Sequence, residues 1–571
     1  RPRGEGPAIA GVTGGGEQIL LENINADPNA SIKMSESFTR CVWHPTGNKM
    51  AVARAYIKTR SVGGVLVEQV NVHAQVVLVS LPSGTRQVIS HNANADFGDG
   101  LPPKRDMPLA WTEDGSALIW SRNSAESDFG TWMTHLDGTA TKINGFVPES
   151  AQLVAPLPTE LVVNVDGDES DASPADGVVD VDLSTPGRQI TLRAALEAAN
   201  DKSGIDTITF DIPAAGTPEI TPASPLPVVT EGVTVDGGTQ PGSGCVRIRG
   251  SATAPVGLTM DASSVTVRGL MITECPTAAI DVVSGGYHVV ESCVIGTDAA
   301  GTAGLGNGIG IRIRNATDPL VGGIQAAARN VISGNKIGID AAATNGLHVA
   351  SNFLGVAADG STPMPSTTTG IVAENCSNLR VGVADAVSVV HAQVGVVARN
   401  ITPLGPQEVG AALENVNFNL DVGGGTQLGT WMETAACIED SEAVTVGGAT
   451  ENTVNAVAGV AQNAYEVIHS TAVEVKGNRI GTDRAGMVAM AVQGAGILVD
   501  GGEDNELGAG EGVLVINATT GVLAQNIDPS EGAAAGLALR NMHLNLNREG
   551  TEQLGTELVT GVRAVQVRNF K

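Results

Sequence analysis

The feature that most constrains this chain is an internal repeat of about 62 residues in its second half. Five segments share a strand-like head and begin 60 to 64 residues apart, at Tyr287, Leu347, Ala411, Val473 and Leu537. Inside two of them the run Ile-Gly-Thr-Asp recurs, at residues 295–298 and 480–483. Self-similarity at a fixed period predicts a solenoid, because each unit buries its apolar face only against its neighbours.

Short strand-like runs rich in Val and Ile recur within each repeat, and we count three of them. We therefore divide the repeat into three coils of about 20 residues, the length of one turn of a parallel β-helix. The prediction for residues 241–571 is an all-β, right-handed parallel β-helix, a pectin-lyase-like solenoid of about 15 coils stacked roughly 4.8 Å apart.

Polar residues recur at the turns of these repeats. Asp298, Asp359 and Asp483 occupy equivalent loops, which indicates repeated turn chemistry rather than one unique site. Four asparagines are predicted to form a structural ladder between turns: Asn330, Asn400, Asn463 and Asn526. The intact run Asn-Val-Ile-Ser-Gly-Asn at 330–335 resembles a motif of other bacterial parallel β-helix repeat proteins.

The first 145 residues have a different pattern. Two segments that begin at Trp43 and Trp111 each read as a strand, a tight turn and a second strand, and another hairpin-like pattern follows each of them. Residues 38–145 resemble the blades of TolB-like propellers, which implies a partial β-propeller-like region over residues 1–145. Trp43, Trp111, Trp120 and Trp132 are expected to be core residues of these blades.

A linker and an acidic module are predicted between these two regions. Residues 146–162 contain three prolines and no periodicity, so they are expected to connect domains, and residues 163–240 are expected to form an acidic, capping module. Five aspartates crowd its first part: Asp166, Asp168, Asp171, Asp176 and Asp180. Calcium would suit these oxygen ligands, although the EF-hand pattern is not met; a solvated acidic loop is the alternative.

A short amphipathic helix is predicted at 190–200, with Thr191 as its N-cap and its apolar face covering the end of the coil stack. A strand follows at 206–212. Residues 163–213 closely resemble the CSLREA module of secreted and surface-associated bacterial proteins. Val179 and Ile190 stand where that family usually has cysteines, which puts its disulfide in doubt. The resemblance implies a cap on a parallel β-helix in an exported protein.

Composition limits the partners. A formal net charge of −28 argues against binding to nucleic acid or anionic lipid, because both need a positive field. The six cysteines show no metal-finger spacing, and no stretch reaches the roughly 18 apolar residues of a membrane helix. The chain starts at Arg1 rather than Met, so we expect a processed or truncated product whose export signal lies upstream.

The repeats lack the converging carboxylates that polysaccharide hydrolysis needs, and aromatic residues for sugar stacking are scarce. Trp431 is the one candidate for ligand contact. We therefore expect a non-enzymatic, extracellular or cell-surface structural or adhesive protein of a fibre, sheath or surface layer. Its expected partners are other copies of itself, surface proteins or polysaccharide. Two alternatives stay open: a polysaccharide-active lyase or hydrolase of this fold, and a calcium-dependent glycan-binding protein.

Overall fold

The structure is a computed structural model, and it divides into two compact units between Pro158 and Thr159, inside the predicted linker. It describes the following residues: 32–43, 49–62, 65–80, 85–88, 105–111, 117–123, 130–135, 140–144, 160–174, 178–201, 206–299, 301, 303–323, 325–364, 367–382, 386–405, 408–429, 432–508, 510, 512–529, 536–547, 551–555 and 558–568.

The first unit is built from two four-stranded antiparallel meanders. They comprise β1 (Ile32–Trp43), β2 (Lys49–Val62), β3 (Val65–Ser80), β4 (Thr85–Val88), β5 (Arg105–Trp111), β6 (Ala117–Asn123), β7 (Gly130–His135) and β8 (Ala140–Asn144). A parallel pairing of β3 with β5 at Ala74 and Arg105 joins the two meanders into one sheet. Trp120 is buried, and its Nε1–H donates to the Thr134 hydroxyl at 2.9 Å.

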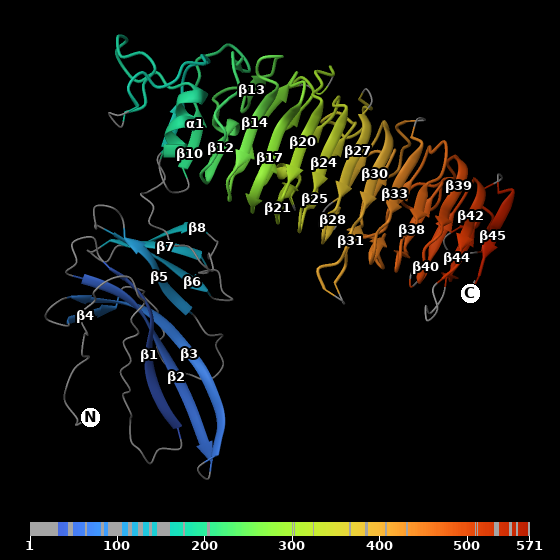
Figure 1. The fold of residues 1–571 in the computed structure, drawn as a ribbon, viewed down its shortest axis with the longest axis horizontal. Coiled ribbons are helices and arrows are strands. Elements are labelled where there is room, and N and C mark those ends of the chain that lie inside the picture. The colour runs from blue at the N-terminus through green and yellow to red at the C-terminus, as the bar shows by residue number, and fades with distance from the viewer. Residues whose placement is uncertain are drawn as a thin grey trace. The chain divides into compact units, whose positions relative to one another are not determined.

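The second unit is a right-handed parallel β-helix made of three long parallel sheets, whose strands follow one another along the stack (Figure 1). Sheet I contains β9 (Glu160–Val163), β10 (Asp206–Phe210), β12 (Val233–Asp236), β15 (Thr266–Arg268), β18 (Val289–Glu291), β22 (Leu320–Gly322), β25 (His348–Ala350), β28 (Leu379–Val381), β31 (Ala411–Leu413), β34 (Val444–Val446), β37 (Glu474–Val475), β40 (Asn505–Leu507) and β43 (Leu537–Leu539).

Sheet II contains β11 (Glu219–Ile220), β13 (Val246–Arg249), β16 (Leu270–Thr273), β19 (Val294–Ile295), β23 (Val331–Ile332), β26 (Phe353–Leu354), β29 (Val387–Val389), β32 (Val416–Phe418), β35 (Ala456–Val457), β38 (Asn478–Ile480), β41 (Val513–Val515) and β44 (Met542–Leu544). Sheet III contains β14 (Val256–Asp261), β17 (Ala278–Gly286), β20 (Ile309–Arg314), β24 (Ile337–Ala342), β27 (Thr367–Glu374), β30 (Ala392–Arg399), β33 (Thr434–Glu439), β36 (Tyr465–Ile468), β39 (Val492–Asp500), β42 (Ala518–Ile527) and β45 (Thr560–Val567), and β21 (Ala316–Thr317) pairs with β17.

The parallel β-helix is confirmed, but its coil length differs from the prediction. Successive sheet I strands begin at His348, Leu379 and Ala411, so one coil takes about 31 residues and contributes one strand to each sheet. The 62-residue repeat is therefore two coils, and the predicted three coils of about 20 residues, some 15 in all, are wrong. The solenoid also starts earlier than residue 241, because β9, β10 and β12 already pair in parallel.

The two-coil period follows from loops that alternate along the stack. Every second coil carries a long hairpin between its sheet II and sheet III strands. Isolated antiparallel bridges close these hairpins, at Thr297–Gly304, Val356–Pro363, Leu420–Gln427, Thr482–Ala489 and Leu546–Gln553. A hairpin is two strands wide, so its width of about 9–10 Å matches two coil spacings of about 4.8 Å. The stack therefore has room for one hairpin for every two coils.

The N-terminal end of the stack is covered by a helix, as the sequence predicts. Helix α1 (Leu192–Asp201) begins after Thr191, whose hydroxyl accepts from the Ala194 N–H at 3.1 Å. Leu192, Leu196 and Ala199 are buried, and α1 contacts β9 and β10 (Figure 1). The predicted strand is β10, with alternating burial. Among the described residues, no helix has the length and apolarity needed to cross a membrane.

Candidate functional site

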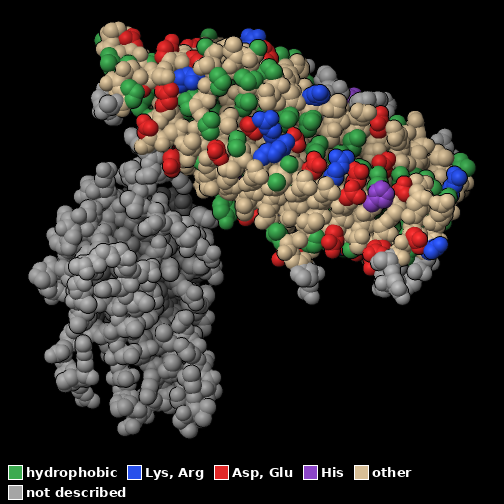
Figure 2. Space-filling view, viewed as in Figure 1, with side chains coloured by type: hydrophobic (Ala, Val, Ile, Leu, Met, Phe, Trp, Pro, Cys, Tyr) green, Lys and Arg blue, Asp and Glu red, His purple; other side chains and the backbone are tan. Residues whose placement is uncertain are grey.

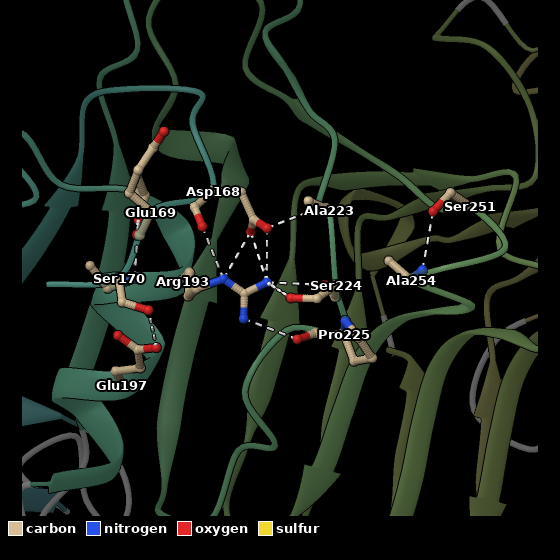
Figure 3. Close-up of polar contacts among 12 residues, drawn as sticks. Asp168, Glu169, Ser170, Arg193, Glu197, Ala223, Ser224, Pro225, Ser251 and Ala254 are labelled. Atoms are coloured by element: carbon tan, nitrogen blue, oxygen red, sulfur yellow. Dashed lines mark hydrogen bonds and ion pairs between the residues drawn. The ribbon is translucent and has the colours of Figure 1, made fainter.

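The acidic module is held together by an ion pair between Asp168 and Arg193 of α1. The two side chains approach to 2.9 Å and both are largely buried. Asp168 also accepts from the Ala223 N–H at 2.8 Å, and Arg193 donates to the carbonyl oxygens of Ser224 and Pro225 (Figure 3). Asp168 therefore fastens the acidic loop to α1 and to the following loop, and Arg193 neutralises its charge.

Of the other aspartates proposed as calcium ligands, Asp166 is exposed, and Asp171 and Asp180 accept hydrogen bonds from backbone N–H groups. Asp171 accepts from the Ser173 N–H at 3.1 Å, and Asp180 accepts from the N–H groups of Asp182 and Gln189, each at 3.1 Å. Asp176 lies outside the described residues. Within the described part of the chain, no three acidic, His or Cys side chains gather as a metal site would require. In these contacts the carboxylates stabilise the conformation of their own loop.

The four asparagines predicted to form one ladder occupy different environments. Asn330 is fully buried; its side chain donates to Val290 O and to Asn352 Oδ1 and accepts from the Cys293 N–H. Asn400 follows β30 and Asn526 lies near the end of β42, with φ of 51° and 53°, a conformation that Asn tolerates. Asn463 precedes β36 and accepts from the Ala495 N–H. The single ladder is wrong, since these positions lie at different points of the coil.

The recurring loop aspartates do serve turn formation. Asp359 accepts from the Thr362 N–H, and Asp483 accepts from the N–H groups of Met487 and Val488 at 2.7 and 2.9 Å. Asp421 and Asn547 make the same kind of contact in their own hairpins. The hydrogen bond from the Thr362 hydroxyl, with those from the N–H groups of Ser361 and Thr362, lowers the pKa of Asp359 to about 2. These carboxylates bind their own loops.

The outer face of sheet III carries charged side chains among apolar ones such as Val372 and Leu498, and three ion pairs join neighbouring coils there (Figure 2). Arg312 binds both carboxylate oxygens of Asp281, at 2.7 and 2.6 Å. Arg314 binds Asp340 at 2.6 Å, and Arg399 binds Glu439 at 2.7 Å. Each pair bridges strands on adjacent coils, so these charges stabilise the stacking as well as solvating the face.

The outer face of sheet II is different, because the hairpins fold over it. We call the five bridged hairpins the hairpin layer. Beneath it Phe353, Val331 and Val390 form a second apolar cluster outside the coil interior. The Arg329 guanidinium lies 4.2 Å from the centre of the Phe353 ring, a cation–π contact. A second cluster under the hairpin layer comprises Leu420, Ala456 and Ala458.

A recess opens on this face over the last sheet II strands, where β38, β41 and β44 follow one another. Arg479, Leu514 and His543 point outward into it, and Thr450, Glu451 and Val454 of the preceding loop form a wall. The Arg479 side chain is only 7% exposed, and its Nη2 binds the Glu451 carboxylate at 2.6 and 2.8 Å.

A second, half-buried arginine lies beside this recess. Arg484, from the hairpin of the same coil, donates to the side-chain oxygens of Asn417 and Asn415 at 3.0 and 2.6 Å and to Glu451 O at 3.2 Å. Burial lowers the pKa of Arg484, and the neighbouring Arg479 lowers it further. The sequence analysis missed both arginines. The available signal was Arg484 itself, which stands in the second copy of the Ile-Gly-Thr-Asp loop where the first has Ala299.

Trp431, the predicted ligand contact, lies outside the described residues. Among the described cysteines, Cys245, Cys275, Cys293, Cys376 and Cys437 are free thiols. Burial raises the pKa of Cys275, Cys293 and Cys437 to about 12, which leaves these thiols protonated and poorly nucleophilic at neutral pH.

No protein-family model matches this chain, and no curated protein is similar to it in sequence. Among solved structures, the A-module of the Azotobacter vinelandii mannuronan C-5 epimerase AlgE6 is 11% identical, with a TM-score of 0.31, and the match covers 66% of this chain and 93% of the module. The catalytic domain of a GH87 α-1,3-glucanase in complex with nigerose is 12% identical, with a TM-score of 0.26 and coverage of 73% and 63%. At these values the matches say nothing about activity.

Proposed function

We propose that this chain is an exported, surface-associated rod with a structural or adhesive role. The observation that carries the proposal is the use of charge on the open face of sheet III. Asp281, Asp340 and Glu439 each bind an arginine of an adjacent coil. A carboxylate bound in this way holds coils together, whereas a general acid or base must be free to exchange a proton with a substrate.

Three further features support the proposal. The likeness of residues 163–213 to CSLREA modules, and that of the two N-terminal meanders to TolB-like blades, favour export and a surface location. The net charge of −28 keeps such a rod soluble. The same charge repels polyanions, except where basic residues form a local site. Repetition of one coil design provides an extended face on which other copies, surface proteins or polysaccharide can bind.

One place on sheet III favours the enzymatic alternative. Glu374, Arg399 and Glu439 stand in register on three successive coils, so two carboxylates flank one guanidinium. Two carboxylates on one exposed face are the minimum for glycoside hydrolysis. A polysaccharide-active version of this protein would act here.

The two functions are separated by incubating the purified chain with a panel of acidic and neutral polysaccharides. New reducing ends and unsaturated uronate absorbance are measured for turnover, and cosedimentation is measured for binding. We expect no turnover, together with either cosedimentation or self-association in light scattering. Turnover that Glu439→Gln abolishes and Asp281→Asn preserves would refute the structural role and locate the chemistry at Arg399.

A further inference from the structure

We propose that Asn315 and Asn375 are attachment sites for N-linked oligosaccharides. Each begins an Asn-x-Ser/Thr sequon whose middle residue is not proline, which is the acceptor signal for this modification in exported proteins. The inference rests on the export proposed above, because the transfer takes place outside the cytoplasm. It goes further by assigning a covalent modification to one edge of the solenoid.

Both asparagines occupy the same corner of the coil, directly after a sheet III strand. Asn315 follows β20 and Asn375 follows β27, and only β24 lies between these strands in the sheet. Arg314 is in register with Ala342, and Ala342 with Glu374, so the two acceptors lie on one edge, two coils apart. At this spacing they are about 10 Å apart along the stack.

The two side chains are accessible. Asn315 and Asn375 are exposed, with φ of 49° and 53°. Within the described residues the Asn375 side chain makes no hydrogen bond, and the Asn315 amide donates to Val283 O at 3.4 Å. Asn330, by contrast, is buried and uses its amide group to join coils. An oligosaccharide at Asn315 or Asn375 therefore leaves the stacking of the coils intact.

The hydroxyl residues distinguish these sequons from ordinary corner residues, because a left-handed corner by itself favours asparagine. The corner does not require asparagine, since Ala343 occupies it between the two acceptors, with φ of 51°. Thr317 and Ser377 follow the acceptors by two residues, and within the described part of the chain their hydroxyl groups make no hydrogen bond. An internal hydrogen bond therefore does not account for the hydroxyls, whereas the acceptor signal requires them.

The three other sequons of the chain differ from these two. Asn29 lies outside the described residues. Asn400 shares the corner but is half-buried, and Pro403 directly follows its sequon and restricts the backbone of the residue before it. The Asn517 side chain lies against Gly555 of the last hairpin. The proposal is therefore confined to the exposed pair.

The donor in this reaction is an oligosaccharide linked to a lipid through phosphate. Nδ2 of the asparagine forms a bond to C1 of the first sugar, and the bond from C1 to the phosphate oxygen breaks. The lipid phosphate leaves, and Nδ2 gives up one proton. Nδ2 keeps its second hydrogen, so the contact from Asn315 to Val283 O can remain. The attached chains are bulky and hydrophilic and would cover the corner beside the open face of sheet III.

The test is peptide mass spectrometry of the full chain isolated from the cells that make it, with the exported fraction analysed apart from the cytoplasm. We expect glycan masses on the peptides of Asn315 and Asn375 in the exported fraction. Thr317→Ala should abolish the glycan at Asn315, and Thr317→Ser should retain it, because serine keeps the hydroxyl. His469→Asn, at the same corner with φ of 47°, creates a sequon with Thr471 and should add a glycan.

Asn526 is the internal control. It is exposed, with φ of 53°, but Asp528 stands where a sequon has its hydroxyl residue. A glycan on Asn526 would overturn the proposal, and so would exported protein that is unmodified at both Asn315 and Asn375. The second result would leave the proposed export standing, whereas protein found only in the cytoplasm, without glycans, would refute both proposals.

Discussion

Sheets II and III belong to the same coils, yet their outer faces differ. Sheet III has an open outer face, on which three arginines pair with carboxylates of neighbouring coils. Sheet II lies under the hairpin layer, where Phe353, Val331 and Leu420 are buried outside the coil interior. The difference shows that one coil design produces an exposed surface on one side and a second apolar layer on the other, according to where the hairpins are inserted.

The largest expected effect tests the burial of sheet II. Phe353→Ala removes a side chain that is 2% exposed, together with its contact to Arg329, and should lower the free energy of unfolding by about 3–5 kcal/mol. Val372→Ala is the matched control on sheet III of the same coil, at a half-buried outward position, and should cost about 1 kcal/mol or less. Chemical denaturation followed by circular dichroism measures both, and equal losses would contradict the contrast between the faces.

A smaller effect is expected from the hairpins that cover sheet II. Asp483→Ala leaves the N–H groups of Met487 and Val488 without their acceptor and should cost about 1–2 kcal/mol. Asp483→Asn keeps an acceptor oxygen, as Asn547 does in the last hairpin, and should cost clearly less. Thermal melts of the two variants provide the comparison; a greater loss in the Asn variant would show that charge, rather than the turn contact, matters.

On sheet III the expected effect is smaller again. A double-mutant cycle with Asp281→Asn and Arg312→Gln should give a coupling free energy of about 0.5–1 kcal/mol, because the pair is bidentate but partly solvated. High salt should reduce the coupling. A coupling near zero at low salt would mean that this face is polar without being stabilised by its ion pairs.

The smallest expected effect is a pH dependence of stability that arises on the sheet II side. Burial lowers the pKa of His391, whose ring lies against Gly429 of the hairpin layer. The unfolded chain therefore takes up a proton below about pH 6.5 that the folded chain resists, so stability should fall as the pH drops through that value. His391→Asn keeps the φ of 52° accessible and should reduce the fall in melting temperature between pH 7.5 and 5.5.

Burial lowers the pKa of His288 and His348 as well, so the wild-type melting temperature should fall in acid for more than one reason. The informative quantity is the difference between wild type and His391→Asn. Identical pH profiles for the two proteins would exclude a role for the hairpin layer in acid sensitivity.

Local features were predictable where one segment decides them. The cap of α1 depends on Thr191 and its own first turn, and the burial pattern of β10 follows from its alternating residues. The coil length was not predictable in the same way, because only every second coil carries a hairpin. The 62-residue repeat in the sequence is therefore the distance from one hairpin to the next. The length of one coil is seen only from strand pairing, as in the pairing of Val349 with Val381 in the next coil.

The sequence by itself determined the parallel β-helix, its capped N-terminal end and the turn role of Asp359 and Asp483, because periodicity and turn chemistry act over a few residues. Only the tertiary structure decided which charges meet. Arg193 neutralises Asp168 from 25 residues away, and Arg484 reaches Asn417 across 67 residues. The stack brings together residues one or two coils apart, so these contacts form only when the coils are in register.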